Sequence, residues 1–264
     1  MKLCIISPVS GLEQYATLSD RHLVLAQITD PRYEQFYLRR KEQGDFIILD
    51  NGAYEGAQPD YETYLKRIAF YRPNVVVLPD FPNEHADKTI EAGVKFIEMA
   101  NRRFCFEDFD YMFVPQAERN NWGQWYDGLE TALSAIDFEW IGISKLVKQT
   151  FNYCDSYTRL HLAHHILSLR SSLSIHALGM LDGDLRDYEA LYNSDLITSL
   201  DSSAPVWRGI HGSWLSVPAY QKDWERLGIP VNFSHDLPIS SWSHTIIQAN
   251  LSRLGVNIHA SPTR

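Results

Sequence analysis

Short apolar runs alternate with longer segments of helical periodicity along most of the chain. The apolar runs predict eight strands, at residues 3–6, 22–27, 46–49, 75–78, 111–115, 140–143, 173–178 and 196–200. Segments with helical spacing separate nearly all of them, at residues 31–41, from Pro59-Asp60 onward, and at 84–100, 122–136, 155–169 and 184–192. Such alternation is typical of parallel strands joined by helical crossovers. Eight strands favour a closed barrel, so we predict the (β/α)8 TIM-barrel fold.

The length of the chain supports one barrel. A (β/α)8 barrel needs about 250 residues, and the chain has 264. The last 60 residues, 205–264, contain four of the seven tryptophans. We expect a single TIM-barrel domain, 1–264, with a short C-terminal extension that forms the final barrel helix and a cap.

Net charge and cysteine spacing argue against two classes of protein, non-specific nucleic-acid binders and cysteine-ligated metal proteins. The net charge is −9, which argues against non-specific binding to nucleic acid. Residues 205–264 carry five basic and three acidic side chains, so the remainder carries −11, and a polyanion would have to meet a local patch. The three cysteines show no CxxC spacing, which indicates reduced thiols and no metal site.

No apolar run approaches the length of a membrane span. The apolar start at residues 3–6 ends at Ser7-Pro8, so we interpret it as a first strand, not a signal peptide. We expect a cytoplasmic protein that does not bind membranes.

Polar residues stand at the ends of five predicted strands. They are Asp50 with Asn51 and Gly52, Asp80, Gln116, Ser144, and Asp201. In a barrel of this type the active site lies at the C-terminal ends of the strands. These side chains are therefore expected at one mouth, with Asp201 as the nucleophile.

Three carboxyl groups at one mouth raise one another's pKa, so one can stay protonated while another is ionised. A carboxylate is also the usual nucleophile toward an anomeric carbon. Around them, Gln116 can read a heterocycle edge, Gly142 and Gly179 could expose backbone amides, and Tyr54 and Met180 could wall a planar base. The alternative is that an aspartate after a strand caps a helix or forms a turn.

The histidines and tryptophans have plainer interpretations. His161 and His165 lie four apart on a predicted helix, where a metal pair is possible but a solvated face is favoured. His176 lies inside a strand and is interpreted as a satisfied barrel histidine. The tryptophans favour packing over stacking on bases.

At these residues the chain resembles the tRNA-guanine transglycosylase family (queuine tRNA-ribosyltransferases). Six short motifs match in order between residues 50 and 205: Asp50-Asn51-Gly52-Ala53-Tyr54, Asp80, Val114-Pro115-Gln116, Ile141-Gly142-Ile143-Ser144, Leu178-Gly179, and Leu200-Asp201 with Pro205. The family's three-cysteine, one-histidine zinc motif is missing, since no cysteine follows Cys154. The chain is in this respect similar to the small zinc-less members found in bacteriophages and in DNA-modification clusters.

The resemblance implies a glycosyltransferase that exchanges guanine for a 7-deazaguanine, as in queuosine formation. Asp201 would form a covalent glycosyl intermediate and Asp50 would be the general acid and base. Asp80, Gln116, the Gly142 backbone, Leu178-Gly179, Tyr54 and Asn51 would hold the base, without metal or cofactor. The expected partners are DNA, favoured over tRNA, and a free 7-deazaguanine base, with a partner protein or homodimer possible. The alternatives are an N-glycoside hydrolase of small nucleosides and a non-catalytic base-binding barrel.

Overall fold

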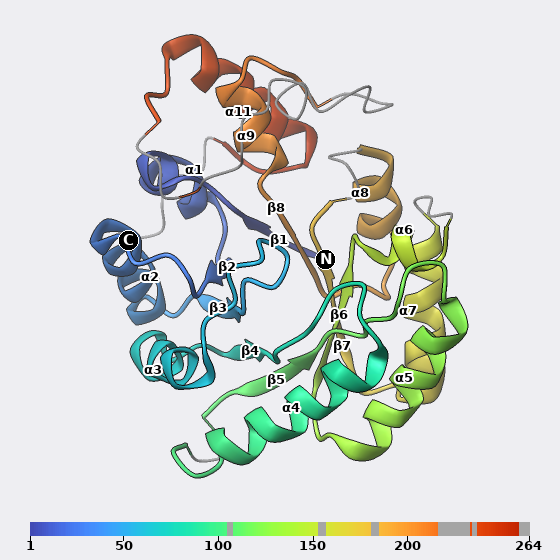
Figure 1. The fold of residues 1–264 in the computed structure, drawn as a ribbon. Helices are drawn as coiled ribbons and strands as arrows, with labels where there is room; N and C mark the ends of the chain where they lie inside the picture. The colour runs from blue at the N-terminus through green and yellow to red at the C-terminus, as the bar shows by residue number, and fades with distance from the viewer. Residues whose placement is uncertain (105–107, 153–156, 181–184, 216–232, 234–236, 259–264) are drawn as a thin grey trace.

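The computed structural model describes residues 1–264 except 105–107, 153–156, 181–184, 216–232, 234–236 and 259–264. Eight parallel strands form a ring surrounded by helices (Figure 1), so the predicted (β/α)8 TIM barrel is confirmed. The strands are β1 (Lys2–Ile5), β2 (Arg21–Leu25), β3 (Phe46–Asp50), β4 (Val75–Val77), β5 (Asp110–Phe113), β6 (Trp140–Ser144), β7 (Ser174–Leu178) and β8 (Ser199–Ser202).

Helices follow the strands along the chain. They are α2 (Pro31–Glu42), α3 (Tyr61–Tyr71), α4 (Ala86–Ala100), α5 (Trp122–Ala135), α6 (Val147–Thr150), α7 (Thr158–Leu169), α8 (Leu185–Tyr192), α9 (Ala204–Ile210) and α11 (Ser241–Arg253). Asp60 caps α3, because its side chain accepts from the N–H of Thr63 at 2.8 Å. Within the described ranges, no helix combines the length and apolarity needed to cross a membrane.

Most strands begin and end within two residues of their predicted bounds, and two places differ more. No helix was assigned to the link between β1 and β2, but it holds three short ones, η1 (Val9–Gly11), α1 (Leu12–Tyr15) and η2 (Ala16–Leu18). Each is too short to show helical periodicity in the sequence. Strand β8 begins at Ser199, three residues later than predicted, so Asp201 lies within the strand.

The ladder of the sheet runs from β1 through β8, β7, β6, β5, β4 and β3 to β2. Strands β1 and β2 then lie side by side and close the ring. At this junction the hydroxyl of Ser19 donates to the carbonyl of Leu3 (2.6 Å) and accepts from the N–H of Arg21 (3.1 Å). A side chain thus joins the two strands that the ladder leaves unpaired.

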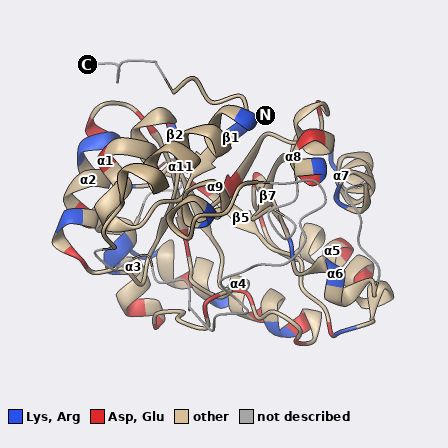
Figure 2. Ribbon diagram, turned by 90° about the horizontal axis from the view of Figure 1, so that it is seen from above, with Lys and Arg blue, Asp and Glu red and all other residues tan. Residues whose placement is uncertain are grey.

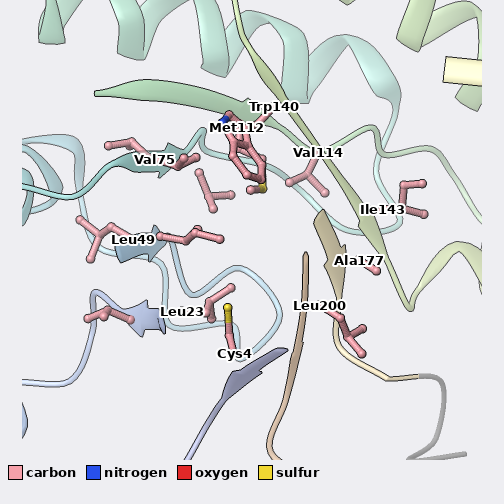
Figure 3. Packing of buried hydrophobic residues seen from close by; sticks show 14 of the residues in the cluster. Cys4, Leu23, Leu49, Val75, Met112, Val114, Trp140, Ile143, Ala177 and Leu200 are labelled. Atoms are coloured by element: carbon pink, nitrogen blue, oxygen red, sulfur yellow. The ribbon is translucent and has the colours of Figure 1, made fainter. Parts of the chain in front are cut away.

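The core fills the barrel and the layer beneath the helices. Strands β4 and β6 are buried on both faces, as expected of parallel strands covered by helices. Figure 3 shows part of this packing, with Met112 beside its ladder partner Trp140 and with Cys4 on β1. The apolar runs of the sequence are therefore explained by burial on both sides of the sheet.

Helices α9 and α11 cover β1 and α1 on the outside of the barrel. Their shared apolar cluster contains Ile5, Tyr15, Val206, Ile247 and Leu251. The helices touch at Gly209, where a Cβ atom would come within 2.8 Å of the backbone nitrogen of Ile247. Only glycine permits this contact. The expected cap stays a prediction, because most of it falls on residues 216–232, outside the described part of the chain.

Candidate active site

The C-terminal ends of the strands form the mouth of the barrel, where the sequence placed its candidate residues. Asp50 is the last residue of β3, Ser144 the last of β6, and Asp201 lies on β8. Asp80 and Gln116 follow the ends of β4 and β5. The parallel ladder brings these groups to one end of the barrel.

Asp80 is the best-held carboxyl group at the mouth. Its Oδ1 accepts from Asn51 Nδ2 at 2.7 Å, and its Oδ2 accepts from Gln116 Nε2 at 2.6 Å. All three side chains are buried. Burial raises the pKa of Asp80 to about 6, against the two hydrogen bonds, which lower it. The sequence predicted each of these residues as a ligand-binding group but not that they bind one another.

Tyr64 on α3 fixes the strand ends that carry two of the carboxyl groups. Its buried hydroxyl lies 2.9 Å from the carbonyl oxygens of both Leu49 and Val77. These residues precede Asp50 and stand just before Asp80 in the chain. A helix residue therefore sets the spacing of β3 and β4 at the mouth. From the sequence alone Tyr64 belongs only to the helical pattern of this segment.

Asp50 is partly buried and has few partners. Its Oδ2 accepts from the N–H of Gly52 at 3.0 Å. The pKa of Asp50 is raised well above its ordinary value, first by desolvation and then by Glu55, Asp80 and Asp201. Asp50 therefore holds a proton at higher pH than an ordinary carboxyl group does.

Asp201 is held by two groups, one on β7 and one directly after it. Its Oδ1 accepts from the N–H of Gly179 at 2.8 Å and lies 3.1 Å from Nε2 of His176. Gly179 has φ +70°, a backbone conformation that favours glycine. Its carbonyl accepts from Arg159 Nη1 at 2.7 Å. Arg159 itself forms a buried ion pair with Asp187. Gly179, which binds Asp201 through its N–H, is therefore held in place through its carbonyl.

The remaining predicted residues divide between the mouth and the core. Tyr54 is exposed at the mouth, with the ammonium group of Lys145 4.0 Å from the centre of its ring. Gly142 lies within β6, where a Cβ would meet Leu178, Val114 and Met112. The role of its backbone amide in ligand binding stays a prediction. Leu178 and the buried Met180 flank Gly179.

Three functional candidates were missed or set aside. Lys145 follows β6 directly and approaches Tyr54 and Glu55. Desolvation and the neighbouring Asp201 raise the pKa of Glu55, whereas Lys145 lowers it. His176, interpreted as a satisfied barrel histidine, contacts Asp201 and Ser199. A lysine directly after a predicted strand was a signal that could have been used.

The charges of the mouth are unbalanced. Asp50, Glu55, Asp80 and Asp201 influence one another, and in the part of the chain that the structure describes Lys145 is the cation that acts on this group. On the outer helices both signs of charge are mixed instead (Figure 2). Among the described residues, no group of three or more histidine, cysteine, aspartate or glutamate side chains is arranged to hold a metal ion.

No family model matches, and no curated protein matches. Among solved structures the chain is similar to a monomeric dihydrodipicolinate synthase variant, with 14% identity, coverage of 97% and 96% of the two chains, and a TM-score of 0.49. It is also similar to N-acetylneuraminate lyase from Mycoplasma synoviae, with 9% identity, coverage of 95% and 79%, and a TM-score of 0.49. Phosphoribosyl anthranilate isomerase from Thermococcus kodakaraensis has 11% identity, coverage of 96% and 99%, and a TM-score of 0.47.

These findings overturn the expected membership in the tRNA-guanine transglycosylase family. The similar structures include dihydrodipicolinate synthases and N-acetylneuraminate lyase, which are not guanine transglycosylases. The predicted base exchange, the glycosyltransferase class, and the nucleic-acid and 7-deazaguanine partners are therefore wrong, and the nucleoside hydrolase and base-binding alternatives gain no support. The physical reason is that polar residues at strand ends are a property of (β/α)8 barrels in general. At these identities the similarity shows the fold alone.

Proposed function

We propose that the protein is an enzyme that performs acid–base chemistry on a small polar molecule at the mouth of the barrel. In this proposal Asp50 donates a proton, and Asp201 is the ionised base or nucleophile. The observation that carries it is that these two carboxyl groups have different surroundings. Asp50 has a raised pKa and accepts one hydrogen bond, from the N–H of Gly52, whereas Oδ1 of Asp201 lies within hydrogen-bond reach of two groups, the N–H of Gly179 and Nε2 of His176.

The charge at the mouth indicates the class of substrate. Within the described residues the mouth holds four carboxyl groups and one ammonium group, and even with Asp50 protonated this excess of acidic groups favours an uncharged or cationic molecule over an anion. Asp80, with Asn51 and Gln116, presents a rigid buried network to such a ligand. We assign these three residues to substrate binding. A cytoplasmic location, which rests on the scattered cysteines of the sequence, belongs to the same proposal.

The proposal is tested by following mixtures of small sugars, polyols, amino acids and amines by time-resolved 1H NMR. Wild-type protein is expected to convert at least one compound. Asp201→Asn should lower that rate by about 10³-fold or more, and Asp50→Asn should also lower it strongly. Asp127→Asn, on the exposed face of α5, is the matched control and should keep the wild-type rate. Conversion that survives Asp201→Asn, or no conversion in any mixture, would contradict the proposal.

Lys145 favours a second candidate function. An amino group at the mouth, beside Glu55 and the ring of Tyr54, could attack a carbonyl substrate and form a Schiff base. Sodium borohydride with pyruvate, glyoxylate or glyceraldehyde would then trap a covalent adduct, seen by intact-protein mass spectrometry. The adduct should be absent from Lys145→Met and present in Lys88→Met, an exposed position on α4. An adduct of equal yield in both variants would exclude Lys145 as the nucleophile.

A further inference from the structure

His176 and Ser199 form a polar pair inside the barrel, below the mouth. The two residues are partners in the ladder between β7 and β8, and both are fully buried. Ring atom Nδ1 of His176 lies 2.7 Å from Oγ of Ser199, and Nε2 lies 3.1 Å from Oδ1 of Asp201. A continuous chain of polar contacts therefore runs from the barrel interior to Asp201.

The direction of these hydrogen bonds follows from Asp201. Its Oδ1 also accepts from the N–H of Gly179 at 2.8 Å. The backbone N–H of Gly179 can only donate, so Oδ1 is an acceptor, and its second lone pair can accept from Nε2 of His176. Nε2 of His176 is therefore the protonated nitrogen, and Nδ1 is left as an acceptor.

The hydroxyl of Ser199 completes the pattern. An acceptor at Nδ1 needs a donor, and the hydroxyl 2.7 Å away can rotate to supply its proton. A doubly protonated ring would instead point an N–H at Ser199 and turn the hydroxyl proton away. Because this part of the barrel is closed to water, such a rearrangement carries the cost of a buried donor without its acceptor.

We propose that Ser199 fixes the Nε2-protonated tautomer of His176, and that this pair holds the carboxyl group of Asp201 in position at the mouth. His176 and Ser199 are positioning residues, since both lie below the reacting groups. Their importance for turnover rests on the proposed function of Asp201, but the tautomer of His176 does not depend on that function and can be measured by itself.

The first experiment observes the histidine ring directly. Protein labelled with 15N-histidine is examined by long-range 1H–15N correlation at neutral pH, and the signals of His176 are identified by their absence from His176→Gln. Wild type should show a protonated Nε2 and an unprotonated Nδ1. Ser199→Ala should lose this pattern, because Nδ1 has lost its donor. Ser202→Ala, a buried serine on the same strand whose Oγ accepts from Ala204, should leave the pattern unchanged.

A second variant covers the case in which Ser199→Ala does not fold. Ser199→Cys keeps a small side chain with a weaker donor, and should shift the signals of His176 in the same direction by a smaller amount. An Nδ1-protonated or doubly protonated ring in wild type would overturn the proposal. So would a folded Ser199→Ala with the wild-type pattern.

The link to Asp201 is tested by a double-mutant cycle on any compound found to be converted. Ser199→Ala should lower turnover by about tenfold in the wild-type background. In the His176→Gln background it should have no further effect, because the amide of glutamine can donate to Asp201 without a tautomer to fix. Equal losses in both backgrounds would show that Ser199 acts by another route. If Asp201→Asn keeps full activity while the tautomer is as stated, the proposed function fails and the hydrogen-bond chain stands.

Discussion

Carboxyl groups at the two ends of the barrel have different kinds of partners. At the N-terminal end, Asp45 accepts from Nε of Arg40 at 2.6 Å and lies 2.6 Å from Nε2 of His22. The guanidinium of Arg21 lies 4.1 Å from the ring centre of Phe46. At the mouth, the carboxyl groups of Asp80 and Asp201 are held by amides, a backbone N–H and an imidazole.

From this difference in the partners of the carboxyl groups we infer that the N-terminal end of the barrel is organised for stability and the mouth for chemistry. A buried carboxylate paired with guanidinium keeps its charge and holds elements together. Carboxyl groups that are buried near one another, as Asp50 and Asp80 are, have raised pKa values. Ionising them near neutral pH therefore lowers the free energy of unfolding. Substitutions at the two ends should therefore change stability with opposite signs.

The largest expected effect is at the N-terminal end. Arg40→Met leaves the half-buried Asp45 with His22 but without its guanidinium partner, which should lower the free energy of unfolding by about 2–3 kcal/mol in urea titrations. Arg39→Met, on the same helix, is the control. Arg39 pairs with Glu13 at an exposed site, so its removal should cost less than about 1 kcal/mol. Equal losses in the two variants would remove the distinction between the ends.

The opposite sign is expected at Asp80. Because its pKa is raised to about 6 in the folded protein, its contribution to stability is fully present below the pKa of the unfolded chain, near 4, and is lost as pH rises through about 6. Wild type should thus lose about 3 kcal/mol between these values from this group.

Asp80→Asn removes this titration, so its free energy of unfolding should fall less over the same pH range. Above pH 7 the variant should be more stable than wild type by about 2 kcal/mol, since one of the two hydrogen bonds is weakened. Urea unfolding from pH 4 to 8 measures both quantities. An unchanged slope in the variant would show that Asp80 is not the titrating group.

The smallest effect concerns Glu55. Glu55 raises the pKa of Asp50, so Glu55→Gln should lower the pKa of Asp50 toward its ordinary value. Carboxyl 13C chemical shifts followed against pH measure this change. Glu62→Gln, on the exposed side of α3, should leave the titration of Asp50 unaltered, and an identical effect from both variants would assign the shift to general charge.

Much of the fold could be predicted because burial on both faces of the sheet leaves a strong local signal. Val75 to Leu78 and Trp140 to Ile143 read as strands from apolar content alone. The helices of the β1–β2 connection could not be predicted, since Leu12 and Tyr15 are buried by tertiary contacts rather than by a repeating pattern. Strand β8 was placed too early because Leu196 and Ile197 are apolar but precede the ladder.

The candidate site shows a similar division. Parallel topology was enough to bring Asp50, Asp80 and Asp201 to one end of the barrel. It could not show that Gln116 and Asn51 bind Asp80, because hydrogen bonds between different loops depend on side-chain geometry. The motif resemblance failed for a related reason, since short matches at strand ends record the fold rather than the reaction.

The hydrogen bonds of the Ser19 hydroxyl make the β1–β2 junction different from the other strand junctions of the barrel. The sheet is a strip of eight strands rolled until its two edges meet, and between those edges the side chain of Ser19 bonds to Leu3 and Arg21 in place of a ladder. A strip closed in this way has one preferred line of opening. In native-state hydrogen exchange, the amides facing this line on β1 and β2 should exchange before those of any other strand pair, and the barrel should unroll from there.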